Sequence, residues 1–337
     1  MDELVQRSIQ ASEAKKRTAV PWEYDKPWKQ PCYAYSSSER KWNASGPDNS
    51  TSSAHIDNST TRSITLLSHN IDFMLPFADS RMNAAVRHLE TLISALDRST
   101  ASVIFLQECV ASDLTLLAND TWVQQNFTLT DTGTENWQSG HYGTVTLIDN
   151  RLPLASCFRI HFSQTNMQRD GLFVNVLLQQ KTVRLCNTHL ESLAFEPAMR
   201  PPQMKLLAQY MKDAAVDGAA VAGDFNAIQD FDRTLHRENG LKDAYLELGG
   251  DEDDAEGGHT WGQQASTTNR ERFGTSRMDK VFYCGSLRCS KFERFGAGLE
   301  VQDEGERKRI IDLGFEKPWI TDHLGVMAVL KVEQTQP

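Results

Sequence analysis

The segment SVIFLQE, residues 102–108, is the strongest indication of how this chain folds. Its apolar run is nearly continuous, which is typical of a central strand that is buried on both faces of a sheet. The run ends in the carboxylate of Glu108. A core strand that ends in a charged residue places that charge at the rim of the sheet, so we expect Glu108 to meet polar groups from neighbouring strands there.

Further strands are predicted on both sides of this segment. They are ITLLSHNI (64–71), 143–148, 172–178, 182–188, AAVAGDFN (219–226), MDKVFYC (278–284) and LGVMAVLKV (324–332). Residues 81–97 place apolar side chains on one helical face, and residues 201–215 predict a second helix that opens with prolines. Strands that alternate with helices favour an α/β architecture. No break in composition divides residues 64–333, so we assign them to one catalytic domain.

The N-terminal region has a different composition. Residues 1–18 are polar and charged, residues 19–42 are rich in aromatic residues and prolines, and residues 43–63 are rich in Ser, Thr, Asn and Gly. We predict an arm and linker over residues 1–63, partly flexible, and a short tail at 334–337. The aromatic part is expected to dock as an extended arm on the main domain, or alternatively to bind a partner.

Composition and charge limit the classes of function. The chain of 337 residues has 35 Lys+Arg and 45 Asp+Glu, so its net charge is −10. Proteins that grip long nucleic acids usually carry a basic face, so a phosphate-bearing substrate must be held locally, by a few cations or by bound metal. No stretch approaches the roughly 20 apolar residues of a membrane helix, and no secretory signal is visible. Six cysteines without CxxC spacing indicate reduced thiols, so we predict an intracellular protein that is not secreted.

Several predicted strands are bordered by a polar side chain, and these side chains are expected to share one rim. They are Asn70, Glu108, His189, Asp224, Asn226, Asp279, Asp322 and His323. Taken singly, each has an ordinary explanation, such as a solvated edge carboxylate, a turn former or a buried imidazole. Together they supply hard oxygen ligands, imidazoles that can stabilise phosphate oxygens, and a carboxylate–amide pair that can orient water. This inventory predicts metal-assisted cleavage of a phosphoester.

The order of these motifs resembles the endonuclease/exonuclease/phosphatase superfamily, which has the DNase I-like fold. The motifs are Asn70, LQE (106–108), THLES (188–192), GDFN (223–226), MDKVF (278–282) and TDH (321–323), within about residues 64–332. HNID (69–72), the Gln-Met-Lys helix at 203–205, HTW (259–261) and RMDKVF (277–282) are most similar to the tyrosyl-DNA phosphodiesterase 2 family. The resemblance implies an α/β sandwich of two packed sheets flanked by helices.

The resemblance also implies a metal site. Glu108 is expected to be the main ligand of a divalent metal, and Asn70 and Asp322 are expected to support the metal directly or through water. Mg²⁺ is the expected cofactor, with Mn²⁺ as an alternative. The metal would act as a Lewis acid and stabilise the leaving oxygen.

The other motif residues are expected to handle the water and the phosphate. Asp224 would orient or deprotonate the attacking water, and Asn226 would position phosphate or water. His189 and His323 would hydrogen-bond the non-bridging oxygens, where charge grows in the transition state. Asp279 would orient His323 and keep it cationic, because a nearby carboxylate raises the pKa of an imidazole.

A further set of residues is expected to contact the substrate. Tyr142, Ser192 and Trp261 match family positions near the substrate, although core packing is an alternative for the two aromatic residues. Arg200 is expected to bind substrate phosphate. The candidate cations for this role are Arg169, Arg200 and Arg277, each of which could instead be a solvated surface residue.

The implied reaction is hydrolysis of a phosphoester by an activated water. The implied substrate is a DNA 5′ end carrying a tyrosyl adduct, the bond that links DNA to a trapped topoisomerase. A short single-stranded footprint is compatible with the acidic charge. One alternative keeps the fold and metal but takes a small phosphomonoester, a lipid headgroup or an RNA end; it is favoured by Ile228, which stands where the relatives carry arginine. Another is a non-catalytic binding protein. We expect a monomer, without membrane contact, in the nucleus or cytoplasm.

Overall fold

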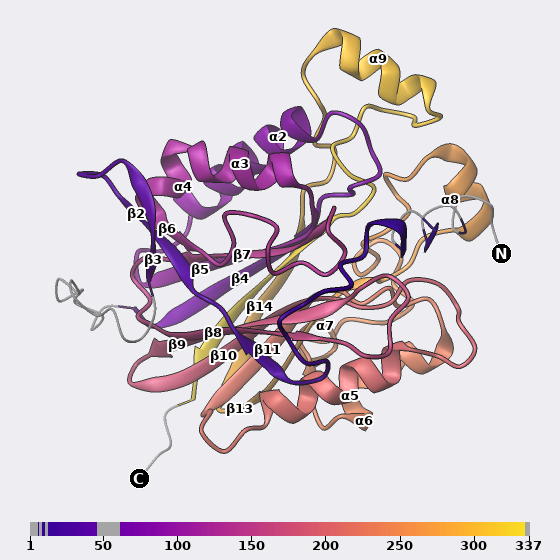
Figure 1. The fold of residues 1–337 in the computed structure, drawn as a ribbon. Helices are drawn as coiled ribbons and strands as arrows, with labels where there is room; N and C mark the ends of the chain where they lie inside the picture. Colours follow the sequence, from indigo (N-terminus) through magenta and orange to yellow (C-terminus); the bar gives the residue numbers. More distant parts are fainter. Residues whose placement is uncertain (1–5, 7–8, 11–12, 46–60, 334–337) are drawn as a thin grey trace.

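The computed structural model describes residues 6, 9–10, 13–45 and 61–333, and it consists of two β-sheets packed face to face (Figure 1). Helices cover the outer faces of both sheets. This arrangement confirms the α/β sandwich that the motifs predicted.

Within the described residues, the first sheet has seven strands, and we call it sheet A. Their spatial order is β1 (Pro27–Lys29), β8 (Leu154–His161), β9 (Asp170–Leu178), β10 (Lys181–His189), β11 (Gly218–Asp224), β13 (Asp279–Gly285) and β12 (Lys242–Asp243). Strands β10 and β11 are parallel, and the other pairs are antiparallel. The parallel pair ends at a single edge of the sheet, and its last residues therefore lie next to each other.

The second sheet, sheet B, has eight strands in the described part of the chain. Their order is β14 (Leu287–Phe295), β15 (Gly325–Val332), β4 (Ser63–Asn70), β5 (Thr100–Cys109), β7 (Gly143–Asp149), β6 (Phe127–Leu129), β2 (Cys32–Ser36) and β3 (Lys41–Ser45). Here β4 and β5 are the parallel pair. Each sheet thus has one central parallel pair whose carboxyl ends can carry functional groups.

Five helices of the described ranges cover the two outer faces (Figure 1). Helices α2 (Ala78–Ser94), α3 (Ala111–Asn119) and α4 (Thr121–Asn126) lie on sheet B, and α5 (Arg200–Met211) and α6 (Leu235–Glu238) lie on sheet A. The other helical segments are η2 (Asp230–Arg233), α7 (Ala244–Glu247), α8 (Thr267–Phe273) and α9 (Glu304–Asp312). None of the helices in the described ranges has the length and apolar character needed to cross a lipid bilayer.

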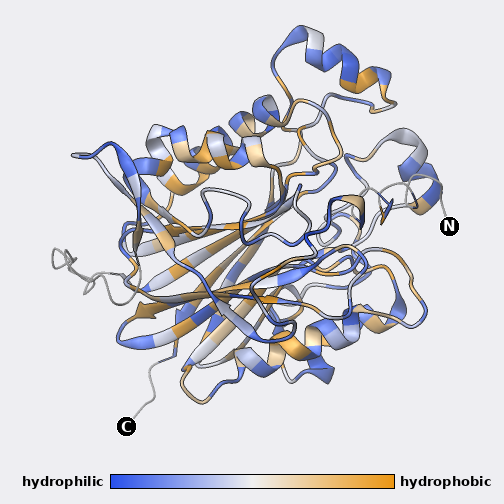
Figure 2. Cartoon of the chain, viewed as in Figure 1, coloured by the Kyte–Doolittle hydropathy of each residue, from blue (hydrophilic) through white to orange (hydrophobic). Residues whose placement is uncertain are grey.

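Apolar side chains fill three layers of the molecule. The central layer lies between the sheets, where Leu66 of sheet B belongs to the same buried cluster as Val174 of sheet A. A second layer lies under α2 and contains Leu89, and a third lies under α5 and contains Leu207. Figure 2 shows the corresponding apolar residues on the strands and on the helix faces next to them. Burial of this apolar surface is the main driving force that holds the sheets and helices together.

The predicted strands from residue 64 onward are all present, but two long strands were missed. Strand β14 is an edge strand with exposed residues at about every second position, so it lacks the apolar run that marks a central strand. Strand β8 is only partly buried over its first three residues, which interrupts its apolar pattern. Helix α2 begins at Ala78 rather than at the predicted residue 81, because the buried Arg81 donates to the carbonyl oxygens of Leu75 and Pro76 and so holds the preceding loop against the helix.

The N-terminal segment docks on the domain, as the first of the two alternatives predicted. Strand β1 pairs with β8 and forms the edge of sheet A, and β2 pairs with β6, so the segment extends both sheets. The buried Trp22 stacks on His161 with ring centroids 3.8 Å apart and an interplanar angle of 5°. The predicted linker at 43–63 lies largely outside the described residues, as does the tail at 334–337.

We predict that Trp22→Ala lowers the free energy of unfolding by about 3 kcal/mol, because truncation of a buried indole removes its apolar contacts and leaves a cavity. Urea denaturation followed by fluorescence and circular dichroism would measure the change. Phe273→Ala is the matched control, since Phe273 is 54% exposed. A loss below about 0.5 kcal/mol for Trp22→Ala, the usual limit for surface substitutions, would contradict stable docking of the segment.

Candidate active site

The polar residues at the strand ends of sheet A lie in register. His189 of β10 is paired with Asp224 of β11, and Asp224 is paired with Asp279 of β13. All three side chains are buried. Three neighbouring strands therefore deliver an imidazole and two carboxylates side by side at one edge of the sheet.

Sheet B delivers Asn70 and Glu108 to the same place. Asn70 ends β4 and is paired with Gln107, the residue before Glu108 on β5. The side-chain nitrogen of Asn70 donates to Glu108 Oε1 at 3.3 Å and to Asp224 Oδ2 at 3.0 Å. A single amide thus connects the rim of sheet B with the rim of sheet A.

Three residues of this region have left-handed backbone conformations, with φ of 56° at Asp72, 59° at Glu108 and 48° at Asn226. Such conformations cost about 1–3 kcal/mol for residues other than glycine, and they are typical of functional sites. At Glu108 the conformation coincides with a break in register between β5 and β7. The Glu108 side chain also accepts a hydrogen bond from the backbone N–H of Phe73 at 2.9 Å. Its carboxylate is therefore held in place from two sides.

His323 precedes β15 and faces both carboxylates of sheet A. Its Nδ1 lies 2.8 Å from Asp279 Oδ2, and its Nε2 lies 3.7 Å from Asp224 Oδ2. Burial disfavours the charged imidazole, but the two carboxylates outweigh burial and raise the pKa of His323 well above its ordinary value. Burial opposes ionisation of Asp224, yet the positive charge of His323 and the neighbouring His189 lower the pKa of Asp224. At neutral pH, a cationic imidazole therefore lies beside an ionised Asp224.

His189 is oriented by Arg169. The guanidinium donates from Nη1 to His189 Nδ1 and from Nη2 to Ser192 Oγ, the latter at 3.0 Å. Because a guanidinium can only donate, Nδ1 must be the acceptor, and the imidazole proton resides on Nε2. This Nε2 lies 3.3 Å from Asp224 Oδ2 and 3.7 Å from Glu108 Oε1. His189 therefore points its Nε2 toward these two carboxylates.

A second group of carboxylates lies on the side of sheet B. Burial raises the pKa of Asp72 to about 8, and the negative charges of Asp322 and Glu108 contribute. Burial also raises the pKa of Asp322, and Glu108 adds to this effect. Crowded carboxylates repel each other, and a divalent cation relieves the repulsion. The carboxylate and amide oxygens of this group are the donors that a hard dication prefers.

A second possible donor set overlaps with the first. In the described part of the chain, Glu108, His189 and Asp224 each place one donor atom within 4.8 Å of the others, and so do Asp224, Asp279 and His323. The second of these sets is already satisfied by the ion pair between His323 and Asp279. Glu108 belongs both to the group that contains Asp72 and Asp322 and to the set that contains His189 and Asp224. It is thus the carboxylate that the two plausible donor sets share.

Trp261 and Tyr142 contact the site from two sides. The Trp261 indole donates to Asp322 Oδ2 at 2.7 Å, and its backbone forms a β-bridge with His323. The Tyr142 hydroxyl donates to the carbonyl oxygen of Met167 at 2.7 Å, and its ring stacks on Phe73 with centroids 4.3 Å apart. Both aromatic residues therefore support groups of the site. Trp261 is partly exposed, whereas the Tyr142 ring is buried, with Phe73 stacked on it and Arg169 against it.

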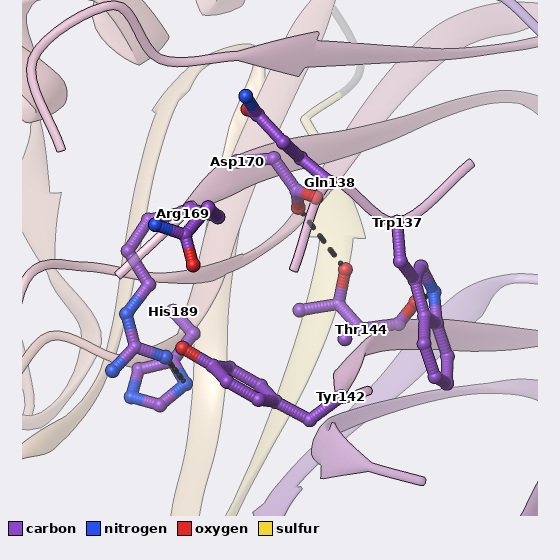
Figure 3. Close-up of a pocket in the computed structure, with 9 residues that line it drawn as sticks. Trp137, Gln138, Tyr142, Thr144, Arg169, Asp170 and His189 are labelled. Carbon is purple, nitrogen blue, oxygen red and sulfur yellow. Dashed lines mark hydrogen bonds between the residues drawn. The ribbon is translucent and has the colours of Figure 1, made fainter. Parts of the chain in front are cut away.

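Figure 3 shows the pocket that adjoins His189. Its lining residues are Trp137, Gln138, Tyr142, Gly143, Thr144, Gln168, Arg169, Asp170 and His189. The Arg169 side chain reaches the His189 ring, and the Tyr142 ring lies beside them. Arg169 brings a positive charge into a site whose other charged groups are mostly carboxylates.

A family model described as "Endonuclease/Exonuclease/phosphatase family" matches residues 67–323. The chain belongs to this family. A curated relative, tyrosyl-DNA phosphodiesterase 2 of Danio rerio, is 24% identical over 241 residues, which cover 70% of this chain and 59% of the relative. The match therefore spans less than two thirds of the length of that relative.

Solved structures of family members share the fold. A humanized D. rerio tyrosyl-DNA phosphodiesterase 2 with 14 mutations aligns with a TM-score of 0.60 at 18% identity, over 80% of this chain and 99% of that chain. A truncated Caenorhabditis elegans tyrosyl-DNA phosphodiesterase 2 aligns with a TM-score of 0.56 at 22% identity, over 80% and 98%. The D. rerio protein in complex with a single-strand DNA product aligns with a TM-score of 0.59 at 18% identity, over 80% and 99%.

The family motif residues of this chain all lie at the site. They are Asn70, Glu108, His189, Asp224, Asn226, Asp279, Asp322 and His323. The Asn226 side chain donates to the carbonyl oxygen of Leu190 at 3.0 Å, and so ties the turn after β11 to the end of β10. The strand ends thus converge as predicted, while the chemical role of each residue stays a prediction.

Arg200 is not available to substrate, and this corrects the prediction that it binds phosphate. Its side chain is buried, Nε and Nη2 donate to the Asp232 carboxylate at 2.8 and 2.7 Å, and Nη1 donates to the carbonyl oxygen of Leu193. The ion pair joins α5 to η2. Arg277 is likewise buried, with Nη2 donating to Asp243 at 2.7 Å. Among the three candidate arginines, only Arg169 reaches the site residues.

Sequence reasoning did not assign a role to Asp72, which the structure places among the site carboxylates. The signal was present, because Asp72 is the last residue of the HNID segment that carries the family resemblance. Its proximity to Asp322, however, depends on loops that are about 250 residues apart, and no local pattern reports such a contact. The choice of Arg169 among the three candidate arginines likewise required the tertiary fold.

We predict that Asp279→Asn lowers the pKa of His323, because the substitution removes the adjacent negative charge that favours the cationic imidazole. The fraction of charged His323 at pH 7.5 then decreases. Titration of the histidine ring signals by NMR would measure this change, and Asp97→Asn, at an exposed carboxylate, is the control. An unchanged His323 titration in Asp279→Asn would show that the pair does not set the charge state of the imidazole.

Proposed function

We propose that this protein is a metal-dependent phosphodiesterase that cleaves a phosphoester by attack of water. The observation that carries the proposal is the hydrogen bond of Asn70 to both Glu108 and Asp224, because it brings an oxygen-rich metal site and a candidate water-activating carboxylate into contact. Residues 64–333 are proposed as the catalytic unit, with residues 1–63 as an arm.

Asp224 is proposed to orient the attacking water. Its ionised state is favoured by the two histidines, and its Oδ1 accepts a hydrogen bond from the backbone N–H of Asn226 at 2.8 Å. These contacts fix the orientation of the carboxylate, which is what a group that aligns a nucleophile requires.

His189 and His323 are proposed to bind the non-bridging oxygens of the phosphate. His189 Nε2 is buried and lacks a hydrogen-bond partner among the described residues, so it is free to donate to a substrate oxygen. His323 carries a positive charge, which stabilises negative charge that develops on the phosphate in the transition state. Arg169 acts through His189 by fixing which imidazole nitrogen carries the proton.

Glu108, Asp72, Asp322 and Asn70 would hold a divalent metal, for which Mg²⁺ is the proposed ion and Mn²⁺ the alternative. The crowded carboxylates of this group favour a dication over protonation. A dication bound there supplies Lewis acid stabilisation of the leaving oxygen.

The proposed substrate is the 5′-phosphotyrosyl bond at the end of a DNA strand. Support comes from the relatives, which are named for this activity and of which one was solved with a single-strand DNA product. The partly exposed indole of Trp261 suits a base or a tyrosyl leaving group. A reaction on DNA ends would take place in the nucleus or cytoplasm.

A second candidate keeps the site but takes another phosphoester, such as a small phosphomonoester, a lipid headgroup or an RNA end. It is favoured by Ile228, which is 44% exposed and offers an apolar side chain after the turn that carries Asp224 and Asn226. Comparison of a 5′-phosphotyrosyl oligonucleotide with these esters, each with Mg²⁺, Mn²⁺ and chelator, separates the two candidates. A higher kcat/KM on the other esters would replace the first proposal by the second.

We predict that Glu108→Ala lowers kcat/KM by about 10²–10³-fold, a loss comparable to that of one electrostatic catalytic contact. The variant should also weaken Mg²⁺ binding in isothermal titration calorimetry, because the shared carboxylate of the donor sets is removed. Glu271→Ala, at an exposed carboxylate, is the control. Wild-type Mg²⁺ affinity in Glu108→Ala would contradict the proposed ligand.

We predict that Asp224→Asn abolishes turnover while the oligonucleotide substrate still binds. The amide keeps the shape of the carboxylate but cannot accept a proton from water, so the rate should fall by about 10²–10⁴-fold. Single-turnover kinetics and fluorescence anisotropy measure the two effects, with the exposed Asp312→Asn as control. Near wild-type rates would remove Asp224 from the mechanism.

A further inference from the structure

The N-terminal basic segment, residues 13–17 (EAKKR), lies against the loop that leads into Tyr142. Arg17 makes three hydrogen bonds to this loop: its backbone N–H donates to the carbonyl oxygen of Gln138 at 2.9 Å, and its guanidinium donates to Glu135 O at 3.1 Å and to Thr134 Oγ1 at 3.0 Å. The basic segment is therefore bound to loop 134–141 by specific polar contacts.

The basic segment also contacts a second part of the pocket wall. Gln168 donates from Nε2 to Glu13 Oε1 at 3.1 Å. Gln138, labelled in Figure 3, and Gln168 both line the pocket that contains His189 and Arg169. The basic segment therefore contacts two lining residues of this pocket. Residues at the far N-terminus thus border the candidate active site, although about 120 residues separate them from the loop in sequence.

The contact is close at the backbone as well. A Cβ atom placed on Gly140 would lie 2.6 Å from the carbonyl oxygen of Lys15, and Gly140 has a φ of 74°. Any other residue at this position would push the basic segment away. Gly140 therefore allows Lys15 to lie directly on the loop beside His141 and Tyr142.

The charges of the basic segment are used in different ways. Arg17 is engaged with the loop, and Lys16 Nζ lies 3.6 Å from Glu13. Lys15 is exposed, and among the described residues it forms no ion pair. The Lys15 backbone carbonyl lies against Gly140, which directly precedes His141 in the loop. Burial lowers the pKa of His141, and the positive charge of Lys15 lowers it further. An exposed cation on a segment that contacts residues of the pocket wall, without an ion pair in the described part of the chain, is suited to attract a phosphate.

We propose that the basic segment is a substrate-binding element, in which Arg17 holds loop 134–141 and Lys15 contacts a phosphate of a nucleic acid strand beyond the one that is cleaved. The inference rests on the proposed phosphodiesterase function, and it adds a second phosphate subsite to that function. A nucleic acid strand carries such additional phosphates at regular spacing, whereas a small phosphomonoester does not. Lys15 of the basic segment therefore favours a substrate with several phosphates. This preference does not require a basic face on the domain.

The test compares two substrates of the same reaction. One is the 4-nitrophenyl ester of thymidine 5′-monophosphate, which has a single phosphate, and the other is a 5′-phosphotyrosyl oligonucleotide of about ten nucleotides, within the usual footprint of single-strand binding proteins. Lys15→Gln should raise KM for the oligonucleotide by about 3–10-fold with little change in kcat, and should leave both constants for the aryl ester unchanged. Lys29→Gln, at an exposed lysine of the same arm, is the matched control and should change neither.

Salt dependence provides a readout that a structural role of Lys15 would not alter. Loss of one phosphate contact to a single strand reduces the slope of log Kd against log salt concentration by about 0.7. This slope is measured by anisotropy with the inactive Asp224→Asn protein, with and without Lys15→Gln, and Lys15→Arg should restore it. Arg17→Ala, in contrast, should impair both substrates, because the loop that leads into Tyr142 loses its anchor.

The outcomes separate the two proposals. If the wild-type protein hydrolyses neither substrate, the proposed function is overturned. Wild-type hydrolysis with equal effects of Lys15→Gln on both substrates, or with no effect on either, would overturn the assignment of the basic segment alone. An unchanged salt slope in Lys15→Gln would do the same.

Discussion

The site depends on one amide side chain that connects the two sheets. Asn70 ends a strand of sheet B and donates to carboxylates of both sheets, Glu108 on its own sheet and Asp224 on the opposite one. Behind it, Gln107 donates to Asn187 across the sandwich at 2.8 Å. Buried polar groups are stable only when they are hydrogen-bonded, so these contacts fix the relative position of the strand ends. The oxygen atoms that could bind a metal, and the Asp224 carboxylate that could activate water, therefore have little freedom to change position.

The same region concentrates negative charge in a buried place, and nearby cationic groups offset part of it. His323 is cationic between Asp279 and Asp224, and Arg169 supplies a charge next to His189. The crowded carboxylates near Glu108 are suited to a dication. At the rim, the docked arm adds Lys15. A chain with a net charge of −10 can thus attract phosphate locally, because screening makes charges farther away than about 10 Å contribute little.

Much of the fold and of the site followed from local patterns. Apolar runs identified the central strands, and their polar ends identified Glu108 and Asp224 as candidates, because burial on both faces imposes a recognisable composition. Edge strand β14 was missed, since its exposed residues carry no such constraint. Arg200 was misassigned for a similar reason: a basic residue has the same appearance in the sequence whether it meets substrate or, as here, a buried aspartate.

Short-range periodicity was sufficient to predict the strands, the α/β architecture and the polar side chains at the strand ends, because these patterns are encoded locally. The order of the motifs indicated the family, and the two-sheet sandwich followed from that resemblance. The three-dimensional packing was needed to show that Arg169 contacts His189, that Asp72 joins the acidic group, and that residues 13–17 lie beside the pocket. These properties arise from contacts between segments far apart along the chain. Their geometry and electrostatics depend on burial and distance, which exist only once the strands have assembled.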